Sequence, residues 1–282
     1  MLPIRPNTPT EAHEATDRWR IGDTPLSSRF LLGTAGYPSP DALRRAIKVS
    51  GSQVLTLGLK RTLGTTGQDN GFVQIIRDTA REHGAHLLPN TAGCTTAREA
   101  VQLAHMAREL YGTPWVKLEV IGDDYTLQPD PQELVEAARQ LARDGFTVFP
   151  YCTEDLVTAK RLLDAGCPLL MPWGAPIGSG QGLMNPFALR LLRERLPGVV
   201  LIIDAGLGAP SHAAQALEMG FDAVLLNSAV SQSPDPVRMA GAFRGAIEAG
   251  RAAHRAGVMA RQDFAVATTP VTGNPFLIGN AP

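Results

Sequence analysis

The feature that most constrains this chain is a short apolar run followed by a helical stretch, a unit that repeats eight times. Each run is rich in β-branched and other apolar residues, has the length of a strand and ends in a turn. Strands that alternate with helices pair in parallel, and eight such units over about 220 residues are typical of a closed (β/α)8 TIM barrel. An open, doubly wound sheet is the alternative, but the even spacing and the count of eight favour the barrel. The predicted strands are 30–34, 53–59, 86–89, 115–121, 147–151, 168–172, 199–203 and 223–226.

Several of the predicted helices begin with capping signals. Asp130 precedes Pro131, so an N-cap carboxylate and a proline in the first helical turn occur together. Thr95 or Thr96 is the predicted cap of the helix after the third strand, and Glu99 lies three residues after Thr96, as in a capping box. We predict helices at 41–49, 70–83, 96–110, 131–143, 154–165, 186–195, 211–219 and 236–250.

The eight units form one predicted catalytic domain at residues 28–260, and no linker divides it. A chain of 282 residues with 44% hydrophobic content is large enough for one barrel. Residues 1–27 are polar and proline-rich, and we predict an N-terminal extension with little core of its own and a short helix near residues 10–20. Residues 261–282 lack a helical period, which predicts a C-terminal tail, either a flap over the barrel mouth or a disordered segment.

The composition narrows the class of protein. A formal net charge of −1 gives no electrostatic reason to expect binding to nucleic acid or to an anionic membrane. We find no apolar run long enough to span a membrane and no signal peptide. The three cysteines, an odd and widely spaced set, do not form a disulfide pattern, and no pair of histidines has metal-binding spacing. These features favour a cytoplasmic enzyme without a structural metal.

The fourth predicted strand carries two charged residues, Lys117 and Glu119, inside an apolar run. Side chains alternate along a strand, so residues two positions apart point the same way. One interpretation is an ion pair on an exposed edge strand. The other is an imine-forming lysine with a carboxylate beside it for proton transfer, since an unpaired buried lysine is costly. Burial would favour the neutral amine that such a lysine needs.

Glycine-rich segments follow strands six, seven and eight, at the end of a barrel where active sites lie. Glycines let backbone N–H groups approach an anion closely, and a following helix N-terminus adds favourable partial charge. The predicted phosphate-binding rim therefore comprises loops 174–182, 204–208 and 227–229. Asp204 ends the seventh apolar run, so its carboxylate should project into the mouth, either as a helix cap or as a second acid/base group that faces Glu119.

Taken together, these segments resemble thiazole synthase, from about residue 27 to residue 269 and nearly without gaps. The segments that carry the resemblance are Ser28-Arg29-Phe30, Leu88-Pro89-Asn90-Thr91-Ala92-Gly93, Lys117-Leu118-Glu119-Val120-Ile121-Gly122, Leu127 with Pro129-Asp130, Met171-Pro172 with Gly174-Ala175-Pro176-Ile177-Gly178-Ser179-Gly180, Asn185-Pro186, Asp204-Ala205-Gly206 and Leu225-Leu226-Asn227.

The resemblance implies a (β/α)8 enzyme that makes the thiazole phosphate moiety of thiamine. The substrates it implies are 1-deoxy-D-xylulose 5-phosphate, dehydroglycine (2-iminoacetate) and sulfur from the C-terminal thiocarboxylate of a small sulfur carrier protein. It implies no cofactor, and assembly as a dimer or a tetramer. Lys117 matches the family's Schiff-base lysine, and Glu119 and Asp204 match its acid/base pair. The matched sugar-phosphate positions are Gly178, Ala205, Gly206, Asn227 and Ser228.

The sequence also departs from the family pattern. After strand one the family usually reads Gly-Thr-Gly-Lys-Tyr, whereas Gly36 stands at the position of the lysine. This change bears on rim contacts, such as the docking of a partner, more than on imine chemistry. Two other functions stay open: another imine-forming lyase or aldolase that acts on a phosphosugar, and a binding subunit that has lost turnover.

Overall fold

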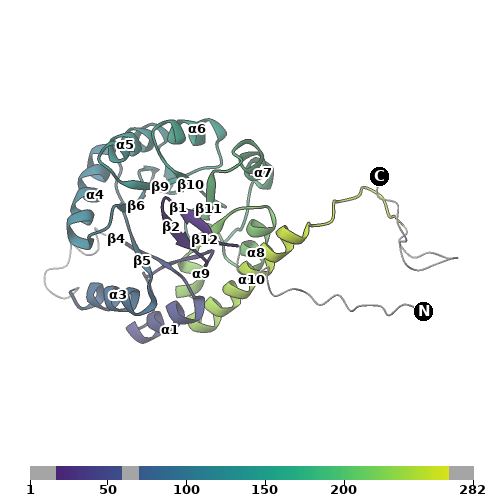
Figure 1. Ribbon diagram of the computed structural model, residues 1–282, viewed down its shortest axis with the longest axis horizontal. Helices are drawn as coiled ribbons and strands as arrows, with labels where there is room; N and C mark the ends of the chain where they lie inside the picture. Colours follow the sequence, from purple (N-terminus) through teal and green to yellow (C-terminus); the bar gives the residue numbers. More distant parts are fainter. Residues whose placement is uncertain (1–16, 59–69, 267–282) are drawn as a thin grey trace, which may run out of the picture.

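Eight parallel strands close into a barrel, which confirms the predicted (β/α)8 fold (Figure 1). The structure is a computed structural model, and it describes residues 17–58 and 70–266. The ring order is β10-β11-β12-β3-β4-β5-β6-β9, so the first and last barrel strands, β3 and β12, are hydrogen-bonded neighbours. Their bounds are β3 (Phe30–Gly33), β4 (Val54–Gly58), β5 (His86–Asn90), β6 (Trp115–Leu118), β9 (Thr147–Cys152), β10 (Leu169–Pro172), β11 (Val200–Asp204) and β12 (Ala223–Leu226). The open-sheet alternative is therefore wrong.

Helices surround the barrel (Figure 1). Apolar side chains between the helices and the strands form the larger core. Both predicted capping signals are confirmed: Thr96 Oγ1 accepts from the Glu99 N–H at 3.3 Å, and Asp130 Oδ1 accepts from the N–H groups of residues 132 and 133. In the described part of the chain no helix is long and apolar enough to cross a membrane. The helices are α1 (Pro40–Ser50), α3 (Asn70–His83), α4 (Ala97–Tyr111), α5 (Pro131–Arg143), α6 (Leu156–Asp164), α7 (Pro186–Arg195), α8 (Pro210–Glu218), α9 (Ser228–Ser231) and α10 (Pro236–Ala256).

A hairpin of β1 (Trp19–Ile21) and β2 (Thr24–Leu26) fills the end of the barrel where the strands begin. The predicted helix near residues 10–20 is wrong at its described end, because Trp19 and Ile21 alternate with an exposed residue and pair across a turn at Gly22. Trp19, Ile21 and Leu26 are at most 6% exposed and pack with the barrel interior. Residues 17–26 therefore contribute to the core, contrary to the prediction.

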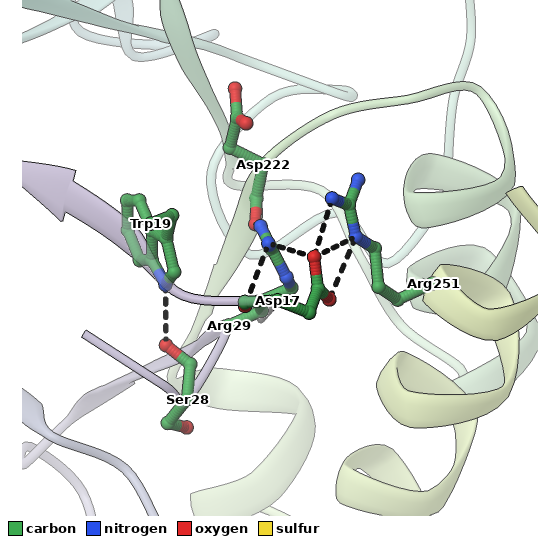
Figure 2. A network of polar contacts seen from close by, with 6 residues as sticks. All are labelled: Asp17, Trp19, Ser28, Arg29, Asp222 and Arg251. Carbon is green, nitrogen blue, oxygen red and sulfur yellow. Dashed lines mark hydrogen bonds and ion pairs between the residues drawn. The ribbon is translucent and has the colours of Figure 1, made fainter. Parts of the chain in front are cut away.

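The hairpin is fastened to α10 by a charged network, shown in Figure 2. The Asp17 carboxylate accepts from Arg29 Nη2 at 3.0 Å and from Arg251 Nη2 at 2.7 Å. Arg29 also donates to the Asp222 carbonyl at 2.6 Å, just before β12. Burial alone would raise the pKa of Asp17, but hydrogen bonds and charge from the two arginines outweigh it and lower that pKa to about 2. This end of the molecule is held by buried charge as well as by apolar contact.

The predicted strand at 115–121 is shorter than expected. Strand β6 ends at Leu118, and residues 119 and 120 leave the barrel sheet. Residues 121–123 then form β7 (Ile121–Asp123), which pairs with β8 (Gln128–Pro129) in a separate antiparallel ribbon. Helix α10 runs six residues beyond its predicted end. The predicted tail begins within the described residues, and its part from 267 onward lies outside them.

Candidate active site

Lys117 lies in the barrel interior between two carboxylates. Its Nζ is 3.1 Å from Glu119 Oε1 and 2.6 Å from Asp204 Oδ2. The three residues are only 6%, 5% and 2% exposed. The alternative of an exposed ion pair on an edge strand is therefore wrong.

Two strands from different parts of the ring bring these groups together. Lys117 is the third residue of β6, level with Asn90 on β5 and with Phe149 on β9. Asp204 is the last residue of β11, where it is level with Leu225. Since β9 and β10 stand between β6 and β11, the lysine and Asp204 meet across the mouth and not along one edge.

The charges in this group oppose the effect of burial. Burial by itself lowers the pKa of Lys117, but the attraction of Asp204 and then of Glu119 outweighs it, so the Lys117 pKa is raised. Burial, reinforced by the nearby charge of Glu119, raises the pKa of Asp204, and Lys117 only partly offsets this. The two carboxylates therefore favour the protonated amine, opposite to the effect that burial alone would have.

All eight residues predicted for the site line one cavity of about 370 Å³ at the carboxyl ends of the strands. The charged group of three and the glycine-rich loops both line this cavity. The predicted residues that line it are Lys117, Glu119, Gly178, Asp204, Ala205, Gly206, Asn227 and Ser228. An amine beside two carboxylates can react with a carbonyl group, and backbone N–H groups in glycine-rich loops can bind a phosphate. This cavity is therefore suited to a phosphorylated carbonyl compound.

The loop after β11 has an unusual backbone. Ala205 and Gly206 both have positive φ, 71° and 77°. A Cβ at Gly206 would lie 2.4 Å from the Ala175 nitrogen, so only glycine fits there. An alanine held in the left-handed region is strained, and such strain is concentrated at functional sites.

Asn227 and His212 use their side chains within the protein. With its amide oriented to satisfy both polar atoms, Asn227 Nδ2 donates to the carbonyls of Gly33 and Ala35 at 3.3 and 3.0 Å. His212 Nδ1 accepts from the Gly208 N–H at 3.1 Å. The amide nitrogen of Asn227 is therefore used within the protein.

Sequence reasoning assigned no role to several polar residues of this cavity. Asn90 lines it and is level with Lys117 on the neighbouring strand, and Thr34, Thr56 and Gln232 line it as well. Asn90 could have been found, because it directly follows the third predicted strand, at the end of a barrel where active sites lie. Gln232 follows the short helix α9, which no periodicity indicated.

Gly36, the departure from the family pattern, lies near the same end of the barrel. It has a φ of 81°, and a Cβ there would lie 3.3 Å from Ser231 Oγ. A left-handed backbone of this kind favours glycine over lysine. The substitution thus matches the local backbone and leaves the three charged groups unchanged.

Comparisons with known proteins agree on one family. The family model described as thiazole biosynthesis protein ThiG matches residues 20–270. A thiazole synthase of Coxiella burnetii (strain Dugway 5J108-111) is 57% identical over 260 residues, which are 92% of this chain and 98% of that protein. A thiazole synthase of Nitrobacter winogradskyi is 59% identical over 254 residues, 90% of this chain and 96% of that protein. A solved structure, the Amycolatopsis orientalis BexX/CysO complex, is 30% identical with a TM-score of 0.76, and the match covers 87% of this chain and 98% of that one.

Proposed function

The chain belongs to the thiazole synthase family, and we propose that it condenses 1-deoxy-D-xylulose 5-phosphate, dehydroglycine and sulfur into the thiazole phosphate of thiamine through an imine on Lys117. The observation that carries the proposal is the placement of Lys117 Nζ within 3.1 Å of Glu119 and 2.6 Å of Asp204 in the wall of the cavity. An amine that attacks a ketone needs one group to take its proton and another to move protons on the substrate.

The first step proceeds from the protonated lysine. Lys117 transfers a proton to Asp204, whose pKa burial raises, and the neutral amine adds to the C2 carbonyl of the pentulose phosphate. Return of that proton to the carbinolamine oxygen releases water and leaves the C2 imine. The proton that Asp204 takes from Lys117 is therefore the one that leaves with the water.

The second step moves the carbonyl along the sugar. The imine acidifies the C3–H bond, and Glu119 removes that proton to give an enamine. Transfer of the 3-hydroxyl proton back to C2 then converts the enamine to a C3 ketone with the amine still on C2. This ketone is the site that sulfur attacks, after which dehydroglycine supplies the remaining atoms of the ring.

The glycine-rich rim would hold the phosphate of the sugar. Gly178, Ala205, Gly206, Asn227 and Ser228 line the same cavity as the lysine. The left-handed backbone at 205–206 would let main-chain N–H groups approach the phosphate closely. Held there, the substrate would extend across the mouth with C2 toward Lys117. This is how a ketose phosphate would be oriented for attack.

We also propose that a small sulfur carrier protein delivers the sulfur at this mouth. A solved structure that this chain resembles is a BexX/CysO complex, which supports the proposal that this chain binds a second protein. We expect the chain to assemble as a dimer or a tetramer, as the family resemblance implies.

The test is chemical trapping of the imine. The full-length protein is treated with sodium borohydride in the presence of 1-deoxy-D-xylulose 5-phosphate, digested and analysed by mass spectrometry. We expect a reduced adduct on the peptide that contains Lys117, and its loss in Lys117→Ala. Lys160→Ala is the matched control, because Lys160 is exposed on α6 and should leave trapping unchanged.

An unmodified Lys117 peptide under these conditions would contradict the imine. The product separates thiazole synthesis from a phosphosugar lyase: with dehydroglycine and a carrier thiocarboxylate present, thiazole phosphate should accumulate. An adduct that forms without any thiazole product would favour the lyase.

A further inference from the structure

The backbone of Glu119 is held by a single side chain from the neighbouring strand end. Strand β6 ends at Leu118, so neither the N–H nor the C=O of Glu119 is part of a strand ladder. The Thr91 hydroxyl takes the place of that ladder: Oγ1 donates to the Glu119 carbonyl and accepts from the Glu119 N–H, both at 2.8 Å. A hydroxyl has one proton to donate and lone pairs to accept, so this one group satisfies both the N–H and the C=O of Glu119.

Thr91 is itself rigidly placed. It is 0% exposed, and its N–H donates to the Lys117 carbonyl at 3.1 Å. Its carbonyl accepts from Cys94, and the Cys94 carbonyl accepts from Ile121 at 2.8 Å. The turn after β5 therefore runs beside residues 117–121 and is hydrogen-bonded to this segment at both of its ends.

We propose that Thr91 is a positioning residue that sets the Glu119 carboxylate against Lys117 and so controls proton transfer at the substrate carbon. The inference rests on the proposed function. Its physical basis is that Glu119 departs from the sheet, so the direction of its side chain depends on the two bonds from Thr91. Lys117 depends on Thr91 less, because β6 pairs with β9 along its length.

The experiment separates imine formation from proton transfer. Thr91→Val keeps the shape of the side chain and removes the hydroxyl, whereas Thr91→Ser keeps the hydroxyl. For each variant, borohydride trapping on Lys117 reports the imine, and NMR of deuterium exchange at C3 of the sugar phosphate in D2O reports proton transfer. We expect Thr91→Val to trap the adduct yet to lose about ten- to a hundredfold in C3 exchange, less than the roughly 10²- to 10⁴-fold that a general acid–base group contributes, because the carboxylate is displaced and not removed. Thr91→Ser should restore exchange.

Thr79→Val is the matched control, because Thr79 is also buried and its hydroxyl donates to a backbone carbonyl, that of Ile75 in α3. It should lower thermal stability without slowing exchange relative to trapping. If Thr91→Val does not fold, Thr91→Ser and Thr91→Cys form a second pair of variants. They differ only in a hydroxyl oxygen or a thiol sulfur at the same position, and the thiol is the weaker hydrogen-bonding group. Exchange should then be slower in the cysteine variant.

Two results would overturn the inference: wild-type C3 exchange in Thr91→Val, or equal losses of trapping and exchange in that variant. Failure of the wild-type protein to form the Lys117 adduct would instead refute the proposed function. Trapping in the wild-type protein therefore distinguishes a failure of the proposed function from a failure of the role given to Thr91.

Discussion

Lys117 can act as a nucleophile only after it loses a proton, and two carboxylates compete to hold that proton. Asp204 lies closer, at 2.6 Å, and burial raises its pKa, so it is the acceptor in the proposed first step. Glu119, at 3.1 Å and held through its backbone, is left for the substrate carbon. In the proposed mechanism, one buried cluster thus divides two proton transfers between two carboxylates.

Replacement of Asp204 by asparagine should separate these roles. Asp204→Asn keeps the size of the side chain but cannot accept a proton, and we expect kcat near neutral pH to fall by about 10²- to 10⁴-fold. The same change removes the nearer counter-charge, so the pKa of Lys117 should fall and the remaining activity should rise with pH as free amine forms. Profiles of kcat/KM from about pH 6 to pH 10 would show this.

Glu119→Gln is the counterpart of that variant. It should slow C3 exchange while Asp204 still accepts the lysine proton, so trapping persists. An Asp204→Asn enzyme with the wild-type rate at neutral pH would refute the role given to Asp204.

At this scale the sequence predicted which residues meet but not their charge state. Lys117 and Glu119 share a face through strand parity, and Asp204 follows from its place at a strand end. The raised pKa of Lys117 depends on its distances to Glu119 and, across the barrel, to Asp204, which a linear pattern does not contain. Thr91 was missed as a contributor because its role lies in backbone bonds to Glu119, and threonine in a loop gives no distinct signal.

Among the elements, the barrel strands and their helices were predicted to within a few residues, because each buries an apolar run or face. The hairpin β1–β2 was missed, since strands of three residues are too short for periodicity to detect and are stabilised by the barrel they fill. The early end of β6 was missed for a different reason: Thr91 competes with the sheet for the peptide of Glu119.

The hairpin should depend on the ionised form of Asp17. Because the pKa of Asp17 is lowered from 3.8 to about 2, its contribution is present above the unfolded value and is lost as pH falls through about 2. At a carboxylate 23% exposed we expect Asp17→Asn to cost about 1–2 kcal/mol in the free energy of unfolding at pH 7. Urea denaturation of wild type and variant should show the difference shrinking below about pH 4.

Asp23→Asn is the control for this variant, since Asp23 is exposed in the turn of the same hairpin. It should leave the free energy of unfolding nearly unchanged at either pH. A deficit in Asp17→Asn that persists undiminished at low pH would show that packing, and not charge, fastens the hairpin.

Over the whole molecule, the two ends of the barrel differ in polarity. The mouth carries the polar cavity, and the opposite end is filled by Trp19, Ile21 and Leu26 against the apolar interior. Burying three side chains of this size contributes about 5–9 kcal/mol, which is comparable with the total stability of a domain.

Deletion of residues 1–26 should therefore unfold the chain or leave it loosely packed. We expect loss of near-UV circular dichroism and strong binding of a hydrophobic dye, whereas deletion of residues 1–15 alone should keep a cooperative thermal transition. A cooperative transition at the wild-type temperature after the longer deletion would show that the barrel folds without its hairpin.

The bonds from Asn227 to Gly33 and Ala35 join the loop after the last barrel strand to the loop after the first. During synthesis, β3 must wait for β12, which emerges about 190 residues later, or roughly 10–40 s at ordinary translation rates. Until β12 pairs with β3, the proposed phosphate-binding rim is incomplete. Competence to bind should arrive abruptly, as the final strand leaves the ribosome.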